Sequence, residues 1–137
     1  MIKQVFDIED YWRIVVFYDL DYDNISPVIK ELKEAGASES AIDECYDMLE
    51  SGCAKAATFS NINEHLSVVL FNPHRSKKDY MNSIAHEAEH VKQAMLKAYN
   101  VEDNGELPAY TLGHIIYMMY PTFKDFVCEK CSNKEKK

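Results

Sequence analysis

The spacing of apolar positions divides the chain into strand-like and helix-like segments. Residues 11–18 are β-branched and aromatic and predict a strand, with residues 2–7 as a shorter partner. Residues 54–60 and 65–71 predict a second pair of strands joined by a turn, and the nearly apolar second strand is expected to be buried. These segments predict a mixed or antiparallel sheet of about three to four strands.

Two shorter helices are predicted between these pairs of strands. Ser26 followed by Pro27 is typical of a helix N-cap and a first helical residue, and predicts a helix over 27–35. Ser38 is expected to cap a second helix over 39–50, where apolar residues recur at helical spacing. Strands and helices together indicate an α+β fold.

Two longer helices are predicted in the C-terminal half. A capping box over 76–79 opens a helix over 77–99, and the residues 103–105 break it. A second helix over 107–120 follows and is expected to stop before Pro121. A tight turn between the two would bring the second helix back antiparallel to the first.

Length and composition indicate one globular domain. The chain has 137 residues, of which 47% are hydrophobic and 28% charged, so we expect a single domain over 1–137. A short helix to about residue 131 and a flexible polar tail over 132–137 are expected at the end. The formal net charge of -8 argues against nucleic acid or an anionic membrane surface as a partner.

The cysteines and the apolar segments indicate a cytoplasmic protein. The chain shows no secretory signal and no apolar run long enough to cross a membrane. Cys45, Cys53, Cys128 and Cys131 are too few for a disulfide scaffold and are expected to be reduced thiols. The last two form an isolated Cys-x-x-Cys pair without further ligands at matching spacing, so we expect them to pack or to lie exposed.

The main candidate for chemistry is His86-Glu87-Ala88-Glu89-His90 on the predicted helix 77–99. Two histidines at positions i and i+4 lie on one face of a helix and can share a zinc ion, and a glutamate beside them can act as general base. On a helical wheel both histidines face away from the apolar stripe, and Glu87 lies between them and that stripe. The histidines therefore face solvent or a cleft.

A catalytic zinc needs a third protein ligand, which must come from outside this motif. The best candidate is Glu106 at the start of the next helix, where the helix dipole also favours a carboxylate. His114 and Asp103 are the alternatives for this role. Tyr110 lies one turn after Glu106 and could donate a hydrogen bond to a developing oxyanion or simply pack between helices.

Two segments resemble a known protein family. Residues 82–91, Asn-Ser-Ile-Ala-His-Glu-Ala-Glu-His-Val, and residues 105–113, Gly-Glu-Leu-Pro-Ala-Tyr-Thr-Leu-Gly, are similar to compact gluzincin-type metallopeptidases of bacteria and their phages. The resemblance implies a small zincin-like domain in which His86, His90 and Glu106 bind zinc and Glu87 is the base. It also implies an edge strand, either 66–71 or its hairpin partner, that binds an extended peptide.

From these observations we expect zinc-dependent hydrolysis of peptide bonds in a peptide or protein substrate. Zinc would activate a water molecule and Glu87 would accept its proton. The alternative is a non-catalytic interaction module built on the same scaffold, which the small size, the acidic charge and the exposed helix face also suit. The oligomeric state and the substrate do not follow from the sequence.

Overall fold

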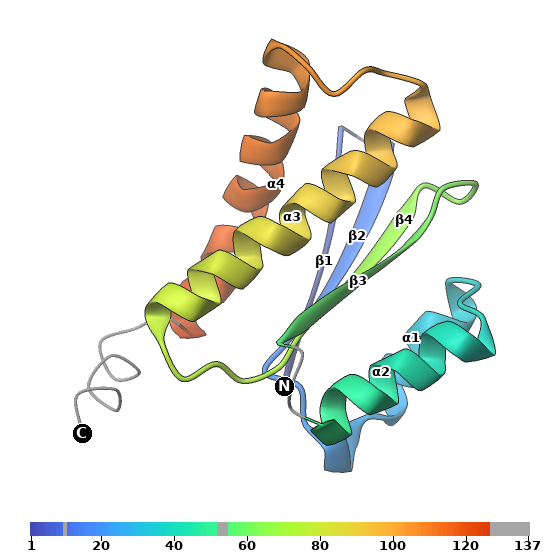
Figure 1. The fold of residues 1–137 in the computed structure, drawn as a ribbon, viewed down its shortest axis with the longest axis vertical. Coiled ribbons are helices and arrows are strands. Elements are labelled where there is room, and N and C mark those ends of the chain that lie inside the picture. Colours follow the sequence, from blue (N-terminus) through green and yellow to red (C-terminus); the bar gives the residue numbers. More distant parts are fainter. Residues whose placement is uncertain (10, 52–54, 127–137) are drawn as a thin grey trace.

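The computed structural model describes residues 1–9, 11–51 and 55–126, and its centre is a mixed sheet of four strands (Figure 1). The strands are β1 (Ile2–Ile8), β2 (Trp12–Tyr18), β3 (Ala56–Asn61) and β4 (Leu66–Phe71). Their order in the sheet is β1-β2-β4-β3. The pairs β1–β2 and β3–β4 are antiparallel, whereas β2 and β4 are parallel.

The two central strands are buried on both faces, as their sequences require. In β2, Ile14 and Val16 pack into one core while Val15 and Phe17 pack into the other. β4 behaves in the same way, and even its polar residue Ser67 is fully buried. Continuous apolar runs are typical of strands that are covered on both sides.

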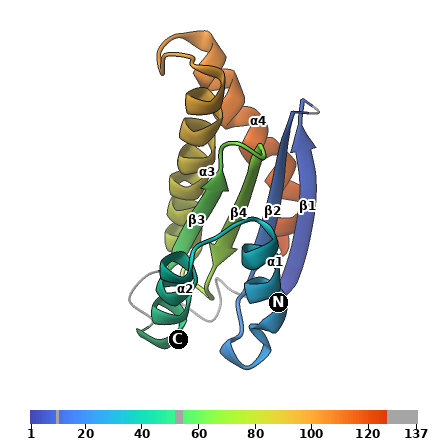
Figure 2. The same cartoon turned by 90° about the vertical axis from the view of Figure 1, so that its right-hand side faces the viewer.

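Helices cover both faces of the sheet (Figure 2). On one face lie α1 (Ser26–Glu34) and α2 (Glu39–Ser51), and on the other lie α3 (Lys77–Tyr99) and α4 (Glu106–Phe123). Two short 3-10 segments, η1 (Tyr22–Asn24) and η2 (Lys124–Phe126), complete the described elements. The α+β class predicted from the sequence is therefore confirmed.

α3 begins and ends as its sequence predicts. The Ser76 side chain caps the helix by accepting a hydrogen bond from the Asp79 backbone N–H at 2.9 Å. The buried face of α3 includes Ile84, Ala88 and Val91, which pack against the sheet. This burial turns the opposite face of the helix, with both histidines, toward solvent.

The prediction that the last helix stops before Pro121 is wrong, because α4 runs from Glu106 to Phe123 with Pro121 inside it. Pro121 lacks the backbone N–H of one helical hydrogen bond, which costs stability. Phe123, two residues further on, is only 2% exposed and packs into the core beside the sheet. Burial of this ring offsets the cost and keeps the last turn helical.

Two other details of the sequence prediction change. Ser26 is the first residue of α1 rather than its N-cap, and the cap residue Ile25 makes no side-chain hydrogen bond. Strand β4 lies inside the sheet, so its hairpin partner β3 is the edge strand beside the candidate site. By contrast, Ser38 caps α2 as predicted, with its hydroxyl oxygen accepting from the Ala41 N–H at 3.1 Å.

Several predicted features lie outside the described residues. These are the pair Cys128 and Cys131, the tail 132–137 and most of the expected last helix. Cys45 is described, and it is a free, buried thiol whose pKa burial raises to about 11. Within the described ranges, no helix combines the length and the apolar character that crossing a membrane demands.

Candidate metal site

The two histidines of α3 converge at their ring nitrogens. His86 and His90 are both exposed, and their Nε2 atoms lie 3.2 Å apart. Two nitrogens that share a zinc ion at about 2.0–2.1 Å with a tetrahedral angle are separated by roughly 3.3 Å. The pair therefore matches two corners of a tetrahedral zinc site.

Glu87 lies beside this pair but is turned toward the sheet. The residue is only 5% exposed, and its Oε1 atom accepts a hydrogen bond of 2.9 Å from the Thr58 hydroxyl on β3. A buried carboxylate needs such a partner, because an unpaired one would be costly. Thr58 thus fixes one carboxylate oxygen and leaves Oε2 for the space between β3 and α3.

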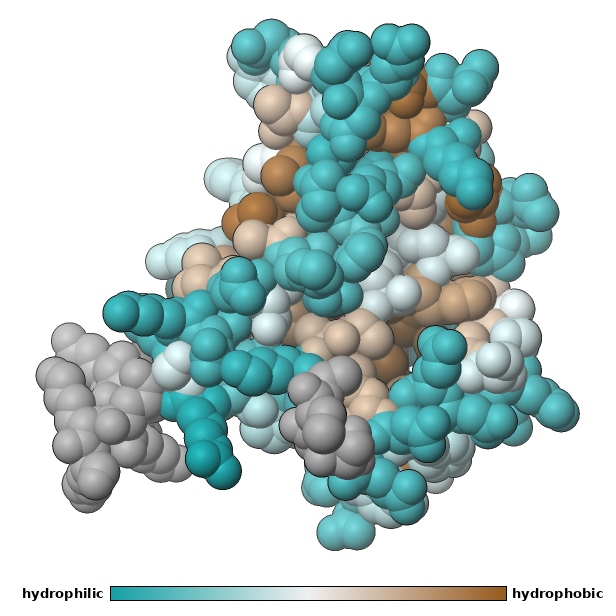
Figure 3. Space-filling model, viewed as in Figure 1, coloured by the Kyte–Doolittle hydropathy of each residue, from teal (hydrophilic) through white to brown (hydrophobic). Residues whose placement is uncertain are grey.

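That space is a groove of about 440 Å³ between edge strand β3 and helix α3. One wall is formed by β3 residues with short side chains, Ala56, Thr58 and Ser60, together with Ala57, and the other is the face of α3 from His86 to Lys97. Short side chains on the strand leave the space open. In Figure 3 the surface beside the hydrophilic ridge of α3 is pale to brown, which fits a wall of small, weakly polar residues.

Glu106, the predicted third ligand, lines a different depression. Its neighbours there include Tyr110 and His114, all on one face of α4, and the depression has a volume of about 490 Å³. Tyr110 is 71% exposed and so does not pack between helices. The structure therefore brings together Glu106, Tyr110 and His114, but it places all three away from the groove that holds His86 and His90.

Asp103, the remaining alternative ligand, is engaged elsewhere. Its Oδ1 atom lies 2.9 Å from Nζ of Lys92, which also contacts Glu89 at 2.8 Å. Lys92 is 8% exposed at its side chain, so this ion pair is partly shielded from water. The contact ties the turn after α3 to the helix.

The donor set in this arrangement is incomplete. Over residues 1–9, 11–51 and 55–126, no group of three or more His, Cys, Asp or Glu side chains is placed to hold a metal ion. His86 and His90 fit a metal as two ligands. Coordination by Glu106 would require its side chain, or the first turn of α4, to move toward the groove.

Two further histidines have defined partners. His74 Nδ1 lies 2.6 Å from the Asn72 carbonyl oxygen, and its Nε2 lies 2.8 Å from the Ser83 hydroxyl at the start of α3. His65 stacks on the ring of Trp12, with centroids 5.3 Å apart. Both residues are structural, and neither belongs to the groove.

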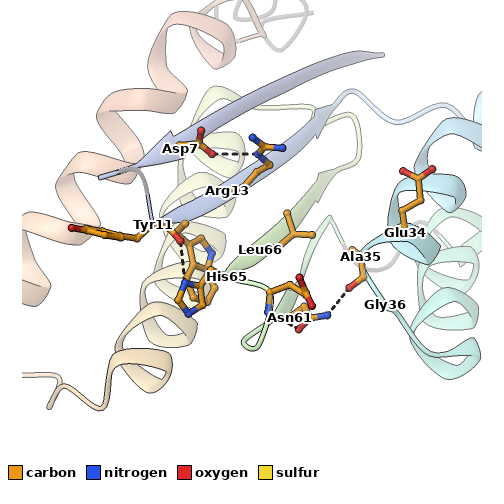
Figure 4. Close-up of a pocket in the computed structure, with 11 residues that line it drawn as sticks. Asp7, Tyr11, Arg13, Glu34, Ala35, Gly36, Asn61, His65 and Leu66 are labelled. Atoms are coloured by element: carbon orange, nitrogen blue, oxygen red, sulfur yellow. Dashed lines mark hydrogen bonds and ion pairs between the residues drawn. The ribbon is translucent and has the colours of Figure 1, made fainter.

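A further depression of about 540 Å³ lies where the β1–β2 turn and the β3–β4 turn meet the end of α1. Figure 4 shows that its polar residues are engaged with one another: Arg13 with Asp7, His65 with the Tyr11 carbonyl, and Asn61 with the Ala35 carbonyl. Its charges are of both signs and do not converge on one point. The groove at β3 is therefore the better candidate for chemistry.

Thr58 and Ser60 are the groove residues that sequence reasoning missed. They lie at alternate positions of β3, so both face α3, while Ala57 and Phe59 pack into the opposite core. Alternation along an edge strand could have indicated this face. The same pattern does not predict that β3 packs beside α3.

Comparison with protein-family models, with curated proteins and with solved structures finds no match to this chain. The gluzincin resemblance therefore stays a prediction from residues 82–91 and 105–113.

Proposed function

We propose that this protein is a zinc-dependent peptidase that cleaves peptide bonds in the groove between β3 and α3. The observation that carries the proposal is the arrangement of His86, Glu87 and His90. Two imidazole nitrogens lie 3.2 Å apart, next to a buried carboxylate whose position a hydroxyl fixes. These residues supply two of the three ligands and the general base that metal-assisted hydrolysis needs.

The chain's own residues would divide the work as follows. His86 and His90 would hold the metal, which when bound supplies a water of lowered pKa and polarises the scissile carbonyl. Glu87 would accept the proton of the attacking water at Oε2 and pass it to the leaving amine nitrogen. Thr58 keeps Oε1 of the same carboxylate against β3 at 2.9 Å.

Glu106 is proposed as the third ligand, with Tyr110 as a hydrogen-bond donor to the developing oxyanion. Both line one depression at the start of α4, so a movement of this whole end of the helix toward the histidines would bring both to the groove. Glu106 is in the first turn of α4, where the helix dipole stabilises a carboxylate.

The substrate is proposed to be an extended peptide that lies along β3. β3 is an edge strand, so one side of its backbone is not paired within the sheet and can bond to an added strand. Its short side chains leave room for a main chain to approach Glu87 and the histidines.

The test is Glu87→Gln, which keeps the size of the side chain but removes the base. We expect the variant to bind zinc like the wild type and to lose hydrolysis by about 10²-fold to 10⁴-fold, the usual contribution of a general base. Metal content is measured by mass spectrometry of the purified protein, and hydrolysis with a quenched fluorescent peptide library.

Glu89→Gln is the matched control. It makes the same chemical change two residues away on α3, at a side chain that does not line the groove and bonds to Lys92 and to the Gln93 amide. We expect it to keep hydrolysis within about twofold. A wild-type protein without stoichiometric zinc and without hydrolysis would contradict the proposal and favour the interaction module.

A further inference from the structure

The direction of the hydrogen bonds behind Ser60 leaves its hydroxyl proton free for a ligand. The Trp12 indole can only donate, and its Nε1 donates to Ser67 Oγ at 3.0 Å. Ser67 is fully buried, and the acceptor described for its own proton is Ser60 Oγ, 2.7 Å away. Ser60 therefore accepts from behind, and its own O–H can donate into the groove that it lines.

Lys97 brings a positive charge to the same end of the groove. β3 and α3 run in the same direction in Figure 1, so Ser60 lies toward the Lys97 end of the helix, beyond Thr58 and Glu87. The ring of His65, which follows the β3–β4 turn, contacts the ring of Tyr99 at the end of α3, with centroids 5.2 Å apart. This contact supports the placement. Lys97 is exposed and has no ion pair with any residue that the structure describes.

The groove is therefore locally receptive to an anion in a chain whose net charge is -8. The acid that lines the groove, Glu87, bonds to Thr58 and lies about 15 Å along the helix from Lys97. At the far end lie the Ser60 hydroxyl proton and the ammonium group of Lys97, whereas the Gln93 amide nitrogen donates to Glu89 at 3.3 Å. Hydrogen bonds to charged groups are stronger than those to neutral ones, so a carboxylate gains more from this set than an amide does.

We propose that Ser60 and Lys97 form a subsite for a carboxylate, and that the substrates of this protein are peptides with an acidic residue near the scissile bond. This inference rests on the proposed function, because it places the scissile bond at His86 and His90. Lys97 follows the midpoint of the two histidines by about 13–14 Å along the helix. An extended peptide covers that distance in about four residues. Because the side chains of Lys97 and of the acidic residue reach toward each other, the acidic residue lies about two to four residues from the scissile bond.

Binding to the Glu87→Gln variant, loaded with zinc, tests the subsite without hydrolysis. The probes are three blocked alanine-based decapeptides that carry one Asp, one Asn or one Lys at the same position, measured by calorimetry. We expect the Asp peptide to bind about threefold to tenfold more tightly than the Asn peptide, as a partly exposed charged hydrogen bond predicts. The Lys peptide should bind most weakly.

Charge reversal at Lys97 is the decisive comparison. In the Lys97→Glu background the order should invert, so that the Lys peptide binds best. Lys33→Glu makes the same change in net charge on α1, on the other side of the sheet, and should leave the order unchanged. Ser60→Ala should reduce the preference for Asp without inverting it.

Three results would overturn the subsite. They are equal binding of the Asp and Asn peptides, equal effects of Lys97→Glu and Lys33→Glu, and no binding of any of the three peptides. Cleavage of a peptide library by the wild-type protein distinguishes a failure of the subsite from a failure of the proposed function. Hydrolysis without enrichment of Asp or Glu contradicts the subsite alone, whereas an Asp preference in binding without hydrolysis contradicts peptidase activity alone.

Discussion

The two helices that carry the candidate ligands differ in how their first turns are held. α3 is fixed by the Ser76 cap, by an ion pair of 2.9 Å between Lys55 and Asp79, and by the bond between His74 and Ser83. α4 begins at Glu106, and its N-cap residue Gly105 has a φ of 79° and offers no side-chain cap. The motif proposed to bind the metal therefore lies on an anchored helix, whereas Glu106 lies on a turn without a side-chain cap.

This difference shows which parts of a metal site are local. His86 and His90 come together because a helix places residues i and i+4 on one face, whatever the helix packs against. Glu106 can join them only if the turn after α3 and the crossing of the two helices allow it. Its uncapped first turn is the part of α4 that can move at the smallest cost, because it has fewer bonds to break.

Glu106→Gln tests whether the two regions form one site, and it has the largest expected effect. If Glu106 joins the histidines, loss of one of three ligands should weaken zinc binding by about 100-fold or more, since even residues that only support a ligand contribute 10-fold to 100-fold. The dissociation constant is measured by competition with a chromophoric chelator.

His114→Ala is the control on the same face of α4. We expect it to change zinc affinity by less than about threefold, because Glu106 rather than His114 is the proposed ligand. The opposite result, an unchanged Glu106→Gln and a weakened His114→Ala, would exchange the two roles. If neither variant changes the affinity, the separation seen between the groove and the α4 face also holds for the metal-bound protein.

Sequence patterns predicted the elements well where a local rule decides the outcome. Helix α3 has the predicted bounds because Ser76 caps it and its apolar stripe faces the sheet. Both pairs of strands follow from β-branched runs separated by turns. The predicted end of α4 was wrong, because burial of Phe123 outweighs the local effect of Pro121.

The candidate site could be predicted only in part. The spacing of His86 and His90 was enough to place their nitrogens together. The partner of Glu87 depends on β3 being the edge strand beside α3, and strand order does not follow from the periodicity of one strand. The position of Glu106 relative to the histidines depends on helix packing, which the sequence pattern leaves open.

Thr58→Val tests the contact that fixes Glu87 and is expected to have the next largest effect. The substitution keeps the shape of the side chain but leaves a buried carboxylate without its donor, which costs about 1–3 kcal/mol of unfolding free energy. Urea unfolding of the metal-free protein gives this value without any assay of activity. If Thr58→Val lowers the unfolding free energy of the wild type but not that of the Glu87→Ala variant, the loss comes from the contact between Thr58 and Glu87.

Thr111→Val is the matched change on α4. The Thr111 hydroxyl donates to the Leu107 carbonyl oxygen at 2.9 Å on the surface of the helix, where water can replace it. We expect a change within about 0.5 kcal/mol. Equal effects of the two substitutions would mean that the groove is held no more firmly than the exposed face of α4.

The smallest expected effect concerns His74, which joins the start of α3 to the loop before it. Burial lowers the pKa of His74 below its ordinary value, as does Lys55, against opposing effects of the Asn72 carbonyl and Asp79. As the pH falls, His74 is therefore protonated in the unfolded chain before it is protonated in the folded protein. Its contribution to the unfolding free energy is complete above a pH of about 6.5 and is lost as the pH falls toward and through the lower pKa of the folded state. We expect the wild type to exceed His74→Gln in urea midpoint most at pH 7.5 and progressively less toward pH 5. A difference that stays constant or grows on acidification would show that the neutral imidazole does not anchor α3.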